Sequence, residues 1–92
     1  MRLSQKEINF IKQTVLNFIT DAKIYIFGSI LNDDIKGGDI DIFIITNKKI
    51  DFLTKSTLKF KLENYLFRPV DLVFHKNFNL LIEKEGLKGI EI

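Results

Sequence analysis

One segment of the chain, DIDIFIIT at residues 39–46, restricts the possible folds more than any other part of the sequence. Side chains alternate across a β-strand. One face of this segment is then rich in isoleucine, while the opposite face begins with Asp39 and Asp41 and is apolar beyond them. A strand that is apolar on both faces belongs in the centre of a sheet that is covered on both sides. The segment therefore predicts an α/β or α+β fold.

The composition fits a single globular domain that spans residues 1–92. Hydrophobic residues make up 46% of the chain and charged residues 28%, which argues against intrinsic disorder. Because 14 basic and 12 acidic residues are intermixed, we expect no direct binding of nucleic acid. The absence of cysteine excludes disulfides and thiolate metal sites. The sequence has no signal-like or membrane-length apolar run, so we expect a soluble, cytoplasmic protein without a membrane partner.

The first half of the sequence predicts a helix followed by strands. Ser4 begins a capping-box pattern, and apolar residues then recur at helical spacing over about residues 5–20. Residues 23–27 are β-branched and aromatic and end at a glycine, which predicts a strand. One helical turn over 29–34 and a glycine-containing turn over 35–38 lead into the acidic strand.

The second half predicts further alternation of helix and strand. Residues 52–66 fit either a strand or a helix, and the length of the segment favours a helix. A strand over 70–74 begins after a proline, where a missing backbone amide is tolerable. Asn77 is expected to cap a last helix that Gly86 ends. The apolar alternation of the tail, LKGIEI, predicts an edge strand or a docking arm.

Asp39 and Asp41 are unusual because they enter an apolar strand. Two carboxylates at this spacing lie ~6.6–6.8 Å apart along a strand, and their rotamers can turn the oxygens toward one point. Each carboxylate disfavours the ionisation of the other, and partial burial adds to that penalty. A hard divalent cation removes the penalty, because Mg²⁺ takes oxygen ligands and needs few of them from the protein.

Two further features fit a site for phosphate chemistry. Asp71 stands inside another apolar strand, where aspartate is depleted. If the two strands are neighbours, three carboxylates converge, which suits the paired metal ions of phosphoryl transfer. Gly28 and Ser29 end a strand and begin a helical turn, which exposes backbone amides that bind phosphate readily.

Each of these features also has a purely structural interpretation. A Gly-Ser pair after a strand is most often only a turn, and an Asp-x-Asp pattern is common in solvated loops and helix caps. Asp71 could instead pair with Arg68 or with a lysine. The combination of three aspartates with the glycine turn favours the metal site over these alternatives.

Together these residues resemble the motif of the polymerase-β-like nucleotidyltransferase superfamily, and in particular its minimal nucleotidyltransferase (MNT) domains. That motif consists of Gly-Ser, a short spacer, Asp-x-Asp and a third aspartate on a later strand. Its counterparts here are Gly28-Ser29, Asp39-Ile40-Asp41 and Asp71. The resemblance covers nearly the whole chain and implies the fold of that superfamily, a small mixed β-sheet flanked by helices.

The resemblance implies a metal-dependent nucleotidyltransferase. Gly28 and Ser29 would bind the phosphates of a nucleoside triphosphate, ATP above all. Asp39, Asp41 and Asp71 would be the catalytic residues and would also hold Mg²⁺ in a two-metal site, with Mn²⁺ as the alternative ion. An acceptor hydroxyl would attack the α-phosphate and release pyrophosphate.

The resemblance also implies a protein partner. Minimal domains of this type are typically antitoxins of helical HEPN ribonuclease toxins, and some of them transfer AMP to the toxin. We expect no separate acceptor-binding domain, so the hydroxyl would come from such a partner; a homo-oligomer is a further option.

Two departures from the motif keep an alternative function open. The spacer over residues 30–38 has nine residues, one fewer than the usual form, and Asn32 and Asp33 stand where many members have arginine and glycine. A carboxylate near a triphosphate is electrostatically unfavourable. The alternative is a catalytically weak or inactive antitoxin of the same fold that acts by binding alone.

Overall fold

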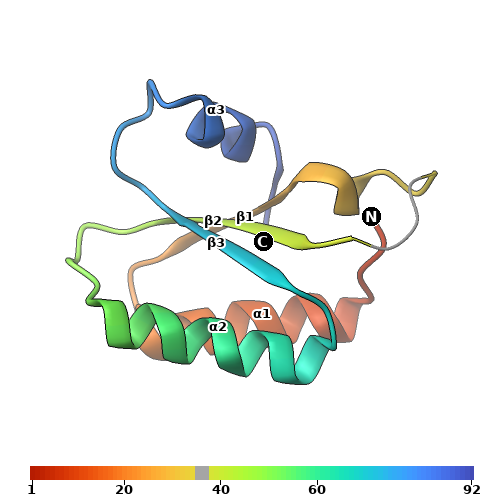
Figure 1. The fold of residues 1–92 in the computed structure, drawn as a ribbon, viewed down its shortest axis with the longest axis horizontal. Coiled ribbons are helices and arrows are strands. Elements are labelled where there is room, and N and C mark those ends of the chain that lie inside the picture. The colour runs from red at the N-terminus through yellow and green to blue at the C-terminus, as the bar shows by residue number, and fades with distance from the viewer. Residues whose placement is uncertain (35–37) are drawn as a thin grey trace.

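The computed structural model describes residues 1–34 and 38–92 and contains a four-stranded sheet with helices on both faces (Figure 1). The strands, in the order β3-β2-β1-β4 across the sheet, are β1 (Lys23–Phe27), β2 (Ile40–Ile45), β3 (Val70–Phe74) and β4 (Ile90–Glu91). The helices are α1 (Gln5–Phe18), the 3-10 helix η1 (Gly28–Leu31), α2 (Phe52–Leu66) and α3 (Leu81–Leu87). Strand β1 is antiparallel to β2 and β4, whereas β2 and β3 are parallel. The predicted mixed α+β architecture is confirmed.

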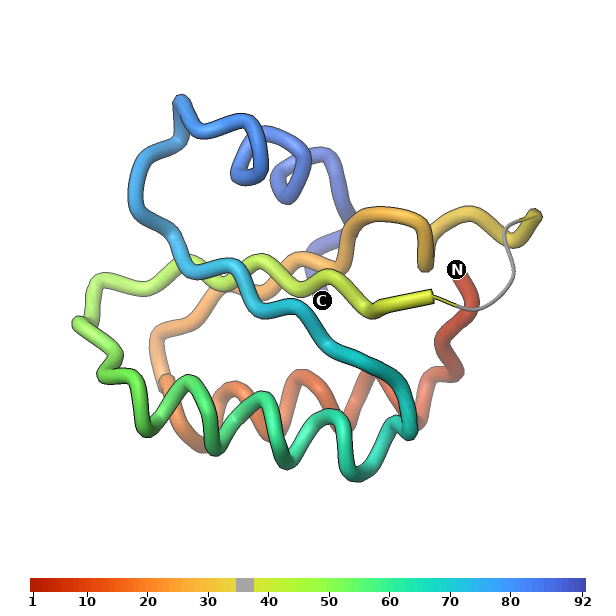
Figure 2. Tube along the Cα trace, in the orientation of Figure 1, coloured from red at the N-terminus to blue at the C-terminus, as the bar shows by residue number. Residues whose placement is uncertain are grey.

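The two faces of the sheet carry different layers. Helices α1 and α2 lie side by side along one face, which we call the helical face (Figure 2). Leu58, Leu62 and Leu66 of α2 are buried there in the main hydrophobic core. The short helix α3 lies on the opposite face, which we call the site face (Figure 1).

Strand β2 is central and covered on both sides, as its sequence predicts. Its residues Ile40, Ile42 and Ile44 enter the core on the helical face, while Phe43 is fully buried against α3. The close approach of α3 depends on Gly86, because a Cβ atom there would lie 2.6 Å from Cδ2 of the Phe43 ring.

Most predicted elements are confirmed with small shifts of their ends. The strands at 23–27 and 70–74 and the helix at 52–66 have the expected bounds, and the tail forms the edge strand β4. Helix α1 begins with the predicted capping box at Ser4 and ends at Phe18, two residues before the expected end. Residues 35–37 lie outside the described residues, so the turn over 35–38 stays a prediction.

The predicted ends of the last helix are wrong. The N-cap of α3 is Leu80, and Gly86 lies inside the helix, which Lys88 caps. The Asn77 side chain accepts a hydrogen bond from the Asn79 amide (2.9 Å) instead of capping the helix. Asn77 does not cap the helix because the buried carboxylate of Glu83 in α3 accepts hydrogen bonds from the backbone amides of Lys76 and Asn77. Among the described residues no helix is both long enough and apolar enough to span a membrane.

Candidate active site

The predicted site residues meet at one end of the sheet because of the strand register. Phe27, the last residue of β1, pairs with Asp41 of β2, and Asp41 in turn pairs with Asp71 of β3. Gly28 follows Phe27 directly and begins η1. The glycine turn and two of the three predicted aspartates therefore lie side by side across three neighbouring strands.

Gly28 is in direct contact with the Asp41 carboxylate. A Cβ atom at Gly28 would overlap Oδ2 of Asp41, and the backbone there has φ +83°. Only glycine adopts this conformation readily and leaves the space that the carboxylate occupies. The sequence predicts glycine here for the approach of a phosphate; the structure adds the carboxylate as a second reason.

The turn after Gly28 is supported by residues distant in the sequence. The Arg2 guanidinium donates from Nη2 to the Ser29 carbonyl oxygen (3.1 Å), and the Arg2 amide donates to the Ile30 carbonyl oxygen (3.0 Å). Gly38, at the end of the spacer, has φ +101° and approaches the Ser29 hydroxyl, since a Cβ on Gly38 would lie 3.4 Å from Ser29 Oγ. The sequence analysis missed Arg2 because no local pattern links it to the turn.

The electrostatic setting of Asp41 differs from that of an ordinary surface carboxylate. Asp41 is half-buried, and burial raises the pKa of its carboxyl above the ordinary value. The negative charges of Asp71 and Asp39 raise that pKa further. Among the described residues neither Asp41 nor Asp71 forms an ion pair with a lysine or arginine, so the structural alternative for Asp71 is not observed.

Asp39 is placed differently from the other two aspartates. It precedes β2, is exposed, and acts on Asp41 through its charge. Within residues 1–34 and 38–92, no three histidine, cysteine, aspartate or glutamate side chains converge closely enough to hold a metal ion. The structure thus brings Asp41 and Asp71 together. Their carboxylates fit Mg²⁺ in donor type, because Mg²⁺ is commonly bound through one or two carboxylates plus substrate phosphates and water.

The side chains of the two residues that depart from the family motif each have a polar partner within the chain. The Asn32 side chain accepts a hydrogen bond from the Asp34 amide (2.9 Å), which is a local turn contact. The exposed Asp33 carboxylate pairs with the Met1 amino group (3.1 Å). This pairing compensates part of the negative charge that Asp33 brings to the region after η1.

Comparison with protein families identifies the class of the chain. The model of the family described as Polymerase beta, Nucleotidyltransferase matches residues 7–92, so the chain belongs to that family. No curated protein sequence matches the chain.

The solved structures to which the chain is similar come from toxin–antitoxin complexes. The chain is similar to the MNT antitoxin in a re-refined structure of the tri-AMPylated Shewanella oneidensis HEPN toxin in complex with that antitoxin. The identity is 24%, the coverage is 97% of this chain and 71% of that chain, and the TM-score is 0.77. The chain is also similar to a chain in the crystal structure of a mutant of the toxin–antitoxin MntA–HpeT. The identity is 24%, the coverage is 92% of this chain and 69% of that chain, and the TM-score is 0.75. A crystal structure of the toxin–antitoxin MntA–HepT matches with 29% identity, 77% and 55% coverage and a TM-score of 0.62.

Proposed function

We propose that the chain transfers a nucleoside monophosphate, AMP from ATP above all, to a hydroxyl group of a protein partner. The observation that carries the proposal is the position of Asp41, which touches Gly28 on one side and is in register with Asp71 on the other. A phosphate-binding turn beside paired carboxylates is the arrangement that nucleotidyl transfer needs.

The chain's own residues would act in the following way. The backbone amides after Gly28 and the Ser29 hydroxyl would bind the phosphates and orient the α-phosphate. Asp71, the exposed member of the pair, would accept the proton of the acceptor hydroxyl. The bond from the hydroxyl oxygen to the α-phosphorus forms while the bond from that phosphorus to the bridging oxygen breaks, and pyrophosphate leaves.

The proposed reaction requires a divalent cation at the aspartates. Asp41 and Asp71, with Asp39 beside them, would hold Mg²⁺, or Mn²⁺ in its place. When bound, the ion neutralises charge on the phosphates and relieves the repulsion that raises the pKa of Asp41.

The proposed partner is a HEPN-type helical toxin, which would make the chain the antitoxin of a pair. Support comes from the similar structures, since one is a HEPN toxin in complex with an MNT antitoxin and the others are toxin–antitoxin pairs. The second candidate function is an antitoxin of the same fold that acts by binding alone. Asn32 and Asp33 favour it, because neither supplies the positive charge or the glycine that many family members have at those positions.

The test mixes the chain with the protein encoded by the neighbouring reading frame, ATP and Mg²⁺. Mass spectrometry should show the addition of one or more AMP units to the neighbour. The double variant Asp39→Asn/Asp41→Asn should abolish the added mass while the two proteins still co-elute on a sizing column. If the wild type binds the neighbour but transfers nothing from any common nucleoside triphosphate, the binding-only function replaces the enzyme.

A further inference from the structure

Strand β3 forms an open edge of the sheet beside the candidate active site. It is the outermost strand and, within residues 1–34 and 38–92, pairs only with β2 (Figure 1). A groove of about 470 Å³ follows this edge, with α2 on one side and the segment leading into α3 on the other. Asp71 lines the groove together with the rest of the strand as far as Phe74. We call it the β3-edge groove.

Alternate backbone groups of β3 face this groove. The strand bonds to β2 through the Pro69 carbonyl, which accepts from Ile40 N (2.9 Å), and through His75 N, which donates to the Ile44 carbonyl (2.9 Å). Because hydrogen bonds to one neighbour come from alternate residues, Leu72 and Phe74 turn their N–H and C=O groups outward. In the described part of the chain these outward groups have no hydrogen-bond partner.

The other end of the same edge shows how such a group is satisfied. The outward amide of Val70 donates to Oε2 of Glu63 in α2 (2.9 Å). A side chain therefore takes the first position on the edge, and the following positions remain free for a ligand.

Positive charge surrounds the free part of the edge. Three lysines line the groove, Lys55 and Lys59 from α2 and Lys76 from the loop after β3. The Lys55 ammonium lies 4.7 Å from the centre of the Phe74 ring, which holds it over the strand. None of the three lysines forms an ion pair within residues 1–34 and 38–92.

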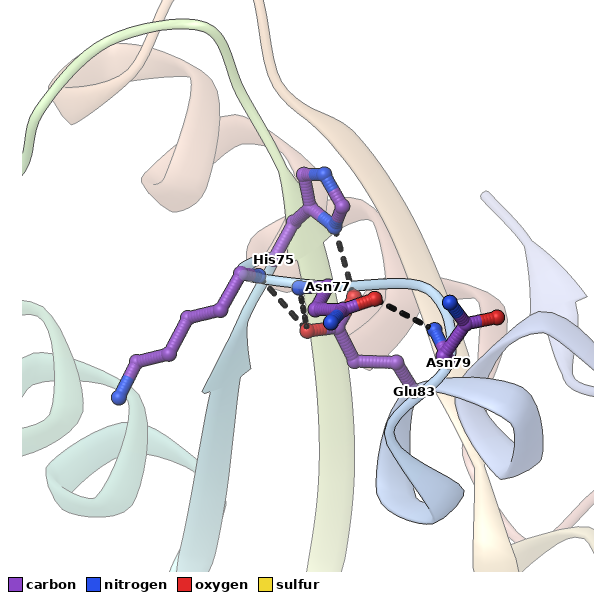
Figure 3. Close-up of polar contacts among 5 residues, drawn as sticks. His75, Asn77, Asn79 and Glu83 are labelled. Atoms are coloured by element: carbon purple, nitrogen blue, oxygen red, sulfur yellow. Dashed lines mark hydrogen bonds and ion pairs between the residues drawn. The ribbon is translucent and has the colours of Figure 1, made fainter.

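The wall on the α3 side is rigidly held. The Glu83 carboxylate, with a side chain only 1% exposed, accepts hydrogen bonds from the amides of Lys76 (2.7 Å) and Asn77 (2.9 Å) and contacts His75 Nδ1 at 2.6 Å (Figure 3). This network fixes the loop that carries Lys76. Exposed apolar side chains complete the groove: Phe52, Leu80 and Ile82.

We propose that the β3-edge groove binds an extended, acidic segment of the acceptor protein as an added strand, which presents its hydroxyl side chain to Asp71. The inference rests on the proposed function for the identity of the acceptor. Backbone pairing at Leu72 and Phe74 would supply affinity, the lysines would select flanking Asp or Glu side chains, and the exposed apolar residues would take alternate side chains of the segment.

The chemistry of the groove favours a peptide over a phosphate chain. The outward groups of Leu72 and Phe74 are both donors and acceptors, which matches another peptide backbone. A phosphate chain offers acceptors only and would leave the carbonyl groups unpaired.

The lysines also have a simpler interpretation, which we call the guarding role: their charge prevents the unpaired edge of β3 from pairing with the edge of a second molecule. However, β3 itself carries no lysine, and the three lysines come from the flanking segments that form the walls. The peptide-binding role and the guarding role can be distinguished, because lysines that only prevent self-association do not change the affinity for a separate peptide.

The test measures peptide binding by fluorescence anisotropy without ATP or Mg²⁺. The probe is a short labelled peptide in which glutamate and valine alternate around a central tyrosine, and its control carries lysine in place of glutamate. The acidic peptide should bind at least about tenfold more tightly than its control, and Lys55→Glu/Lys59→Glu should weaken it by about tenfold. The matched variant Lys6→Glu/Lys12→Glu, which changes two exposed lysines of α1 outside the groove, should leave binding nearly unchanged.

Backbone modification of the probe tests the added strand itself. N-methylation of the peptide amides that face β3 should abolish binding, whereas N-methylation of the opposite set should not. Equal binding of the two peptides, equal loss in the two double variants, or indifference to N-methylation would overturn the proposal. Self-association of Lys55→Ala/Lys59→Ala with unchanged peptide affinity would also overturn it, in favour of the guarding role.

The transfer assay separates this inference from the proposed function. If Lys55→Glu/Lys59→Glu modifies the neighbouring protein with an unchanged KM, the docking inference is wrong and the transferase stands. If the acidic peptide binds as expected while no triphosphate supports transfer, the groove stands as a peptide site and the transferase is wrong.

Discussion

The two faces of the sheet are built by different means. On the helical face, α1 and α2 bury a continuous set of aliphatic side chains, which includes Leu58 and Leu62 at 0% exposure. On the site face, the short α3 packs through a glycine, and the half-buried Asp41 lies in register with the exposed Asp71. The comparison teaches that stability is concentrated on one face, which leaves the other free to hold groups that oppose folding.

Two carboxylates of the site face, Glu83 and Asp41, differ in how their negative charge is compensated. The buried polar network of the site face centres on Glu83, where burial raises the pKa and the hydrogen bonds from Asn77, His75 and Lys76 outweigh it, so the pKa lies below its ordinary value. Asp41, by contrast, has a raised pKa because burial and the charges of Asp71 and Asp39 disfavour its ionised form. The ionised Glu83 carboxylate therefore stabilises the fold, whereas the ionised Asp41 carboxylate destabilises it.

The largest expected effect is on the helical face. Leu62→Ala should lower the free energy of unfolding by about 2–5 kcal/mol, because it removes buried methyl groups and leaves a cavity. Leu53→Ala, at a position of the same helix that is 74% exposed, is the control and should change little. Urea denaturation measures both, and a similar small loss from the two variants would contradict the division between the faces.

The next effect tests the anchor of the site face. Glu83→Gln should destabilise the fold by about 1–3 kcal/mol at neutral pH, because an amide replaces the charged acceptor of two backbone amides. Because the folded pKa is lowered, the contribution of Glu83 is present above its ordinary pKa of 4.5 and is lost as the pH falls below that value toward the folded pKa. Denaturation midpoints from neutral to acid pH should show this loss in the wild type and a flatter profile in the variant.

Glu85→Gln supplies the control for that series. Glu85 is exposed and pairs only with Lys88 among the described residues, at 3.2 Å. If this variant flattened the acid profile as strongly as Glu83→Gln, the buried network would not be the source of the pH dependence.

An effect of similar size is expected where α3 meets β2. Gly86→Ala should lower the free energy of unfolding by about 1–3 kcal/mol, since the new methyl group would lie within 2.8 Å of three Phe43 atoms and push the helix outward. Lys84→Ala, an exposed position of the same helix, should be nearly neutral. Hydrogen exchange should show faster exchange in α3 of the Gly86 variant and unchanged exchange in α2; equal protection in both variants would refute the close packing.

The smallest expected effect has the opposite sign. Because the pKa of Asp41 is raised in the fold, the wild type loses stability as the pH rises from the ordinary value of 3.8 toward the folded pKa. Asp41→Asn should therefore raise the denaturation midpoint slightly at neutral pH in metal-free buffer, whereas the exposed control Asp34→Asn should not. Mg²⁺ should then stabilise the wild type more than Asp41→Asn, and destabilisation by Asp41→Asn would show that the carboxylate is already compensated.

Local patterns predicted the elements where one periodicity runs without competition. The strands at 23–27 and 70–74 follow from their runs of apolar residues, whereas residues 52–66 fitted both periodicities and only the length of the segment favoured the helix that is observed. The start of α3 was predicted wrongly because Asn77 is a good cap in isolation, whereas the buried Glu83 carboxylate binds the backbone amide of Asn77. The contact between Glu83 and the loop before α3 determined where the helix begins. The sequence alone does not show whether this contact or an Asn77 cap is the more stable arrangement.

The sequence by itself determined which residue types are available for chemistry: a glycine turn after a strand, two aspartates at the entry of a central strand and a third in another. Tertiary structure decided that Asp41, and not Asp39, lies in register with Asp71 and against Gly28. It also brought Arg2 to the turn and left the outer edge of β3 open between two walls. The physical reason is that register and edge position depend on the packing of elements that are distant in the chain, whereas a local pattern specifies only the face on which a side chain lies.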